Sequence, residues 1–110
     1  MKQLLCALIC ISVLNFSCKK DQEKPIKPVA EFIIVGQDFT APCLVTFENK
    51  SKNSNQYRWD FGNGAEAFQF TPDIIQMNIK YTEAGTYTVT LEAGGQGYIS
   101  KFTRQITIKP

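Results

Sequence analysis

The chain has 110 residues, and its 12 basic and 10 acidic side chains leave a formal charge of +2. This length accommodates one small domain and excludes a multidomain enzyme. The sequence contains no histidine, which excludes His-based catalytic triads, His metal ligands and His pH switches.

The N-terminal residues have the organisation of an export signal. Residues 4–14 form an uncharged apolar run, which is shorter than the about 20 residues of a membrane-spanning helix but fits a signal-peptide core. Ser17-Cys18 and a charged stretch follow, and this order resembles a bacterial lipobox. The resemblance implies that residues 1–17 are a lipoprotein signal peptide and that Cys18 is acylated. An uncleaved anchor and a secretory cleavage elsewhere are the alternatives.

The next segment, residues 18–28, is predicted to be the lipidated cysteine followed by a charged, proline-containing tether. We therefore expect the protein on the bacterial cell envelope, at the outer membrane, with the membrane as a partner through the lipid. Residues 29–110 are expected to form the folded domain. They carry seven basic and eight acidic side chains, a net charge of −1, so the domain offers no basic face to nucleic acid.

From Val29 onward, apolar residues alternate with polar ones, as in half-buried strands. The pattern predicts strands over 30–34, 45–48, 57–61, 79–81, 87–91 and 106–108, and a weaker seventh over 65–70. A turn is expected over 94–97. Short strands at this spacing predict an all-β, two-sheet antiparallel sandwich. The residues predicted to face inward are Ala30, Phe32, Ile34, Val45, Phe47, Trp59, Phe61, Ile79, Tyr81, Tyr87, Val89, Leu91, Ile106 and Ile108.

Two motifs resemble a known family. The stretch from Tyr57 to Gly64 reads YRWDFGNG and resembles the WDFGDG signature of PKD domains, and the stretch from Tyr81 to Leu91 resembles their Y-x-x-x-G-x-Y-x-V-x-L run. The resemblance implies an immunoglobulin-like sandwich of about seven strands. The residues that carry this fold signature are Trp59, Asp60, Phe61, Gly62, Asn63, Gly64, Tyr81, Gly85 and Tyr87.

The resemblance also bears on function, because PKD domains mostly mediate protein or carbohydrate contacts without catalysing reactions. We expect a non-catalytic envelope lipoprotein that binds a protein or glycan ligand and needs no cofactor. A structural accessory subunit of an envelope complex and a small hydrolase with an unrecognised site are the alternatives. Asp60 is interpreted as capping the signature turn rather than binding Ca²⁺, because calcium needs six or more oxygen ligands and no metal site is expected here.

A candidate binding surface lies within residues 65–78, where PKD domains usually have a shorter loop. The residues proposed for it are Phe68, Gln69, Phe70, Ile74, Ile75 and Met77. Phe68 and Phe70 are two apart and share one face of an extended strand. If that face is exposed, they form an aromatic platform for a sugar ring or a protein. We favour the alternative, in which both rings complete the core at a sheet edge.

Overall fold

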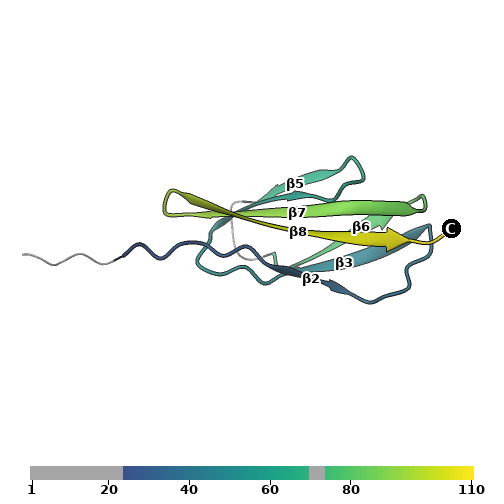
Figure 1. Cartoon of the computed structure of the whole chain (residues 1–110), viewed down its shortest axis with the longest axis horizontal. Coiled ribbons are helices and arrows are strands. Elements are labelled where there is room, and N and C mark those ends of the chain that lie inside the picture. The colour runs from purple at the N-terminus through teal and green to yellow at the C-terminus, as the bar shows by residue number, and fades with distance from the viewer. Residues whose placement is uncertain (1–23, 70–73) are drawn as a thin grey trace, which may run out of the picture.

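The protein is a sandwich of two antiparallel β-sheets (Figure 1). The computed structural model describes residues 24–69 and 74–110, and every regular element within these ranges is a strand, so none of them forms a helix able to cross a bilayer. The strands are β2 (Phe32–Val35), β3 (Cys43–Asn49), β4 (Gln56–Asp60), β5 (Glu66–Gln69), β6 (Gln76–Tyr81), β7 (Gly85–Gly95) and β8 (Tyr98–Ile108). One sheet has the order β2-β3-β6 and the other β5-β4-β7-β8. The predicted fold class is confirmed.

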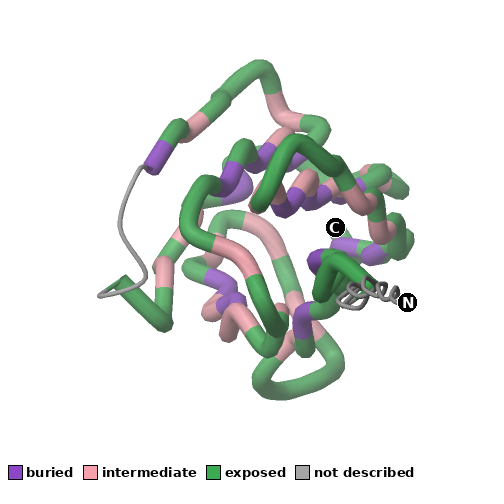
Figure 2. Tube along the Cα trace, turned by 90° about the vertical axis from the view of Figure 1, so that its left-hand side faces the viewer, coloured by how far each residue is buried: buried purple, intermediate pink, exposed green. Residues whose placement is uncertain are grey.

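The core lies between the two sheets and is built largely of aromatic rings. Trp59 is fully buried and stacks on Phe61 with ring centroids 5.3 Å apart. The rings of Phe32 and Phe47, from the opposite sheet, pack against Trp59 at 5.2 and 6.1 Å. Figure 2, which looks along the sandwich, shows buried positions on strands of both layers. A large shared aromatic core of this kind stabilises a domain of this size without a disulfide.

The predicted inward set agrees with the observed core with few exceptions. Ile34, Ile79 and Tyr87 are only partly buried, although they pack against the core. Two apolar residues outside the set are buried, namely Tyr57 and Ala93, which are directly opposite each other on β4 and β7, and the polar Gln69 is buried as well. A period of two residues therefore identifies the buried face, whereas the ends of that face depend on how the sheets meet.

The hairpin of β7 and β8 departs from the prediction. Gly94 and Gly95 belong to β7 and do not form the turn, and β8 begins at Tyr98, eight residues before the predicted strand. The turn itself consists of Gln96 and Gly97, whose φ angles are 51° and 82°. Two consecutive positive φ angles are typical of the tight two-residue turns that join antiparallel strands. The hairpin consequently extends over eleven residue pairs, from Gly85 opposite Ile108 to Gly95 opposite Tyr98.

The segment that precedes the domain is attached near the tip of this hairpin. Val29 and Lys52 exchange two backbone hydrogen bonds of 2.9 Å. The Asn53 side-chain amide donates to the Lys27 carbonyl at 3.3 Å, and the Lys27 ammonium lies 5.1 Å from the centroid of the Tyr98 ring. The N-terminal segment thus leaves the sandwich beside the β7–β8 turn, and the C-terminus lies at the opposite end (Figure 1).

Candidate functional site

The Asp60–Gly62 part of the signature is occupied by structural hydrogen bonds. The Asp60 carboxylate accepts from the Gly62 backbone N–H at 3.0 Å, which caps the turn that follows β4. Gly62 has a φ of 78°, and a Cβ atom at this position would lie 2.5 Å from the Thr88 carbonyl oxygen. Only glycine fits this approach of the turn to β7. The capping geometry is the one expected for Asp60, and no group of three or more Asp, Glu, Cys or His that could hold a metal ion occurs in the described part of the chain.

Asn63 and Gly64 complete the same turn. The Asn63 side-chain oxygen accepts from the Ala65 N–H at 3.0 Å, and its amide nitrogen donates to the Lys80 carbonyl at 3.0 Å. Gly64 has a φ of 91°, in the region that glycine adopts readily. The second of these bonds joins the two sheets, since Lys80 belongs to β6. Asn63 therefore forms hydrogen bonds within the fold through both its amide nitrogen and its amide oxygen.

The tyrosines of the second motif also have structural partners. The buried Tyr81 hydroxyl donates to the Phe61 carbonyl at 2.8 Å and so links β6 to the end of β4. Burial, and then the neighbouring Tyr87, raises the pKa of the Tyr81 phenol above its ordinary value. The Tyr87 hydroxyl donates to the Glu83 carbonyl at 2.6 Å, a local bond of the tyrosine-corner type. Gly85 is the first residue of β7. Both tyrosine hydroxyls therefore have hydrogen-bond partners within the fold.

The candidate surface of residues 65–78 is divided between different parts of the molecule. Phe68 is 57% exposed and lies on β5, so the favoured burial of its ring is wrong. Gln69, proposed for the same surface, is buried instead, and its side-chain amide donates to the Met77 sulfur at 3.5 Å. Met77 is half-buried against the core. Ile74 and Ile75 are exposed and directly precede β6, a strand of the other sheet. Phe70 lies outside the described residues.

Phe68 instead borders a hollow on the outer face of the β5-β4-β7-β8 sheet. The hollow has a volume of about 80 Å³ and is open to solvent. We call it the Gly94 hollow, and its lining residues are Gln56, Tyr57, Arg58, Phe68, Glu92, Gly94 and Ile99. The strand registers explain this grouping: Arg58 is opposite both Phe68 and Glu92, while Gly94 is opposite both Gln56 and Ile99. Four strands therefore contribute to one small surface.

Gly94 lines this hollow, and the backbone conformation does not require a glycine at this position. Its φ is not positive, and a Cβ atom there would meet its nearest neighbours at 3.6–3.8 Å, which is ordinary contact. Gly95, by contrast, would bring a Cβ atom within 2.7 Å of the Asn53 carbonyl oxygen. Glycine in the interior of a strand weakens it and marks places where another molecule or backbone approaches closely. Gly94 leaves room on the sheet surface that the fold itself does not use.

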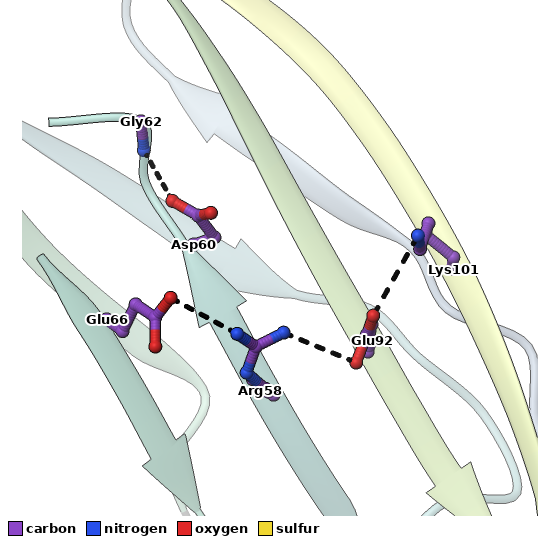
Figure 3. A network of polar contacts seen from close by, with 6 residues as sticks. All are labelled: Arg58, Asp60, Gly62, Glu66, Glu92 and Lys101. Carbon is purple, nitrogen blue, oxygen red and sulfur yellow. Dashed lines mark hydrogen bonds and ion pairs between the residues drawn. The ribbon is translucent and has the colours of Figure 1, made fainter. Parts of the chain in front are cut away.

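The walls of the Gly94 hollow combine apolar and polar groups. Phe68 on one side and Ile99, which is 75% exposed, on the other are large apolar side chains in contact with water. The lining also includes the polar residues Gln56, Arg58 and Glu92. Arg58 donates to Glu66 at 3.1 Å and lies 3.7 Å from Glu92, as Figure 3 shows. An exposed apolar pair with fixed polar groups between its members is typical of a ligand-binding surface.

Sequence reasoning found only one residue of this hollow, Phe68. Gln56, Arg58, Glu92 and Gly94 lie on β4 and β7 in the outward phase of the alternation, so their orientation was available from the pattern. Ile99 was missed because the strand that carries it was predicted to begin at residue 106. Gly94 was missed because it was assigned to a turn.

Comparisons with known proteins agree with the fold. A sequence profile of the PKD domain family matches residues 25–109. Among solved structures, a chain from work on the promiscuous specificity of carbohydrate-binding modules of the β-sandwich superfamily is 31% identical, with a TM-score of 0.67. This match covers 79% of the present chain and 36% of the other, so the present chain spans about a third of that protein's length. No curated protein matches significantly.

Two single PKD domains match over almost their whole length. The PKD1 domain of Vibrio anguillarum Epp is 28% identical with a TM-score of 0.61, and the match covers 78% of the present chain and 98% of that domain. The PKD1 domain of the Vibrio cholerae metalloprotease PrtV is 29% identical with a TM-score of 0.60, covering 77% and 100%. With the signature turn and the tyrosine contacts in place and the family profile matching residues 25–109, the chain belongs to the PKD domain family.

Proposed function

We propose that this protein is a non-catalytic binding module, held at the outer membrane of the bacterial envelope through an acylated Cys18, and that it binds a glycan in the Gly94 hollow. Its fold is one of binding modules, and the similarity to a chain described with carbohydrate-binding modules supports a glycan as ligand. Because one fold hosts many functions, the fold alone does not identify the ligand, and the proposal depends on the residues of the hollow.

The observation that carries it is the Gly94 hollow. A sugar ring has an apolar C–H face and a rim of hydroxyl groups, and the hollow offers the complementary set. Phe68 and Ile99 supply apolar contact, and Gln56, Arg58 and Glu92 supply hydrogen-bond donors and acceptors. The hydroxyls of a saccharide are best recognised where such polar groups are held in place, as the Arg58 guanidinium is between two carboxylates.

The ligand is tested with the mature protein on a glycan array, followed by titration calorimetry on each glycan retained. We expect the Phe68→Ala/Ile99→Ser double variant to lose binding and to keep its melting temperature, because both side chains are exposed. The matched control is Leu44→Ser, which replaces a 65% exposed aliphatic side chain on β3 of the other sheet and should bind normally. Equal binding by the wild type and the double variant, or retention of proteins alone in an envelope pulldown, contradicts a glycan site in the hollow.

The anchor is tested separately. Two or more acyl chains hold a protein on a bilayer stably, because each buried CH₂ contributes about 0.8 kcal/mol. We expect the protein to fractionate with outer membranes and the Cys18→Ala variant to be released or mislocalised. Intact mass spectrometry should give a mature chain that begins at Cys18 and carries lipid. A mature N-terminus without lipid contradicts the anchor and leaves the glycan site untouched.

A further inference from the structure

The polar side chains beside the Gly94 hollow form one row of alternating charge across the sheet. Arg58 Nη2 lies 3.1 Å from a Glu66 carboxylate oxygen, and Arg58 Nη1 lies 3.7 Å from Glu92. The second oxygen of Glu92 lies 3.9 Å from the Lys101 ammonium. The row therefore runs from β5 through β4 and β7 to β8, as Figure 3 shows, and its two acids and two bases cancel.

Both cations of this row already have carboxylate partners. The two Nη atoms of Arg58 point toward different acids, and Lys101 shares Glu92 with Arg58. Asp60, two residues after Arg58 on β4, adds a further negative charge on the same face of the sheet. The row of Glu66, Arg58, Glu92 and Lys101 consequently carries no surplus of positive charge that would attract an anion, and Lys27, over the Tyr98 ring, lies outside this row.

An acidic ligand would have to displace Glu66 or Glu92 from Arg58, or lie next to both carboxylates. Exposed ion pairs contribute only about 0–1 kcal/mol each, so the pairs themselves are not the obstacle. The obstacle is the proximity of like charges, which disfavours a carboxylate or sulfate beside Glu92, itself a lining residue. An uncharged hydroxyl, by contrast, donates to the Glu92 carboxylate or accepts from Arg58 without disturbing the row.

Building on the glycan-binding function proposed above, we infer that the Gly94 hollow selects uncharged saccharides and rejects uronic-acid and sulfated ones. A second hollow of about 360 Å³ adjoins the first and shares Gln56, Gly94 and Ile99 with it. It continues along the glycine-rich end of β7 to Tyr98 at the hairpin tip. The two hollows together provide an elongated surface, so the inferred ligand is a linear chain of neutral sugars rather than a single ring.

The test compares matched saccharides by calorimetry with the mature protein. The probes are neutral hexose and N-acetylhexosamine oligosaccharides and their uronic-acid and sulfated counterparts. We expect neutral chains to bind about tenfold more tightly than the charged ones, a difference of about 1.4 kcal/mol. Their affinity should change little between about 50 and about 300 mM salt, since screening acts mainly on charged ligands.

The Glu66→Gln/Glu92→Gln double variant tests the cause. It leaves Arg58 and Lys101 without the carboxylates that neutralise them, so acidic oligosaccharides should bind at least about tenfold more tightly than to the wild type. The matched control is Glu48→Gln, which removes the acid of an ion pair with Lys50 (3.3 Å) on the other sheet and should not alter selectivity.

The outcomes separate this inference from the function on which it rests. Equal or tighter binding of acidic chains by the wild type overturns the selectivity, while the hollow remains a glycan site. Wild-type selectivity that persists in the Glu66→Gln/Glu92→Gln variant overturns the role of the charge row. If neither neutral nor acidic saccharides bind, the proposed glycan-binding function fails, and the inference fails with it.

Discussion

Two glycines of the same domain should respond to alanine in opposite directions. Gly62 lies in the signature turn with a φ of 78°, and its added Cβ atom would lie 2.5 Å from the Thr88 carbonyl oxygen and 3.0 Å from the Thr88 nitrogen. Gly94 lies on β7 without a positive φ, and its added Cβ atom would meet nothing closer than 3.6 Å. The same methyl group therefore meets strain at Gly62 and ordinary van der Waals contact at Gly94.

The magnitudes follow from these geometries. For Gly62→Ala, a left-handed conformation costs about 1–2 kcal/mol in an L-residue, and the backbone shift that relieves the contact with Thr88 costs about 1–3 kcal/mol. The free energy of unfolding should thus fall by about 2–5 kcal/mol. For Gly94→Ala, removing a glycine from a strand interior raises it by about 0.5–1 kcal/mol. In a domain of this size, 1 kcal/mol corresponds to a shift in Tm of about 4–8 °C.

Urea denaturation and thermal melts of the two variants give the stabilities, and glycan titration gives the function. We expect Gly94→Ala to melt higher than the wild type and to bind its glycan at least about tenfold more weakly, because the methyl group occupies the floor of the hollow. Gly62→Ala should melt much lower and, where folded, bind normally. A Gly94→Ala variant that is less stable would refute the view that the fold does not need glycine there. A more stable variant with unchanged affinity would refute the role of the hollow.

Two further predictions concern the core. Trp59→Ala should lower the free energy of unfolding by about 3–5 kcal/mol, whereas Trp59→Phe should lower it by about 1 kcal/mol. The indole N–H has no hydrogen-bond partner among the described residues, so Trp59→Phe removes an unsatisfied buried donor and leaves only a small cavity. Similar costs for both, measured by urea denaturation, would contradict this. Tyr81→Phe should lower the free energy of unfolding by about 1–3 kcal/mol, because the buried Phe61 carbonyl loses the hydroxyl that donates to it at 2.8 Å. Since the pKa of the Tyr81 phenol is raised in the folded state, its contribution is complete below pH about 10 and is lost as the pH rises further, so Tyr81→Phe should flatten the alkaline fall in Tm. An identical alkaline slope in both proteins would show that other tyrosines cause it.

The aromatic core and the signature turn could be predicted from the sequence because each depends on neighbouring residues. Alternation places Trp59 and Phe61 on one face of β4, and the short polar side chain of Asp60 caps the turn that begins beside it. These are properties of a few consecutive residues, which a period of two and the turn chemistry describe well.

The Gly94 hollow could not be predicted in the same way, since it depends on strand registers. Phe68, Arg58, Glu92 and Gly94 come from three strands, and they are neighbours only because β5 pairs with β4 and β4 with β7 in one particular register. A shift of one residue would turn every side chain of a strand to the other face. The start of β8 at Tyr98 brings Ile99 to the hollow and depends on a turn of two residues, Gln96 and Gly97. The sequence of residues 94–97, three glycines and a glutamine, does not show which two of the four form that turn.

The entry of the chain at one end of the sandwich and its exit at the other has a mechanical consequence. A pull between the N-terminal segment and the C-terminus is directed along the strands (Figure 1), whereas the hydrogen bonds that join β2 to β3 are perpendicular to them. These bonds, together with the two between Val29 and Lys52, are therefore loaded in shear and must yield together rather than one after another. Traction applied in this direction is therefore borne by these bonds, and the rate at which they yield governs forced unfolding.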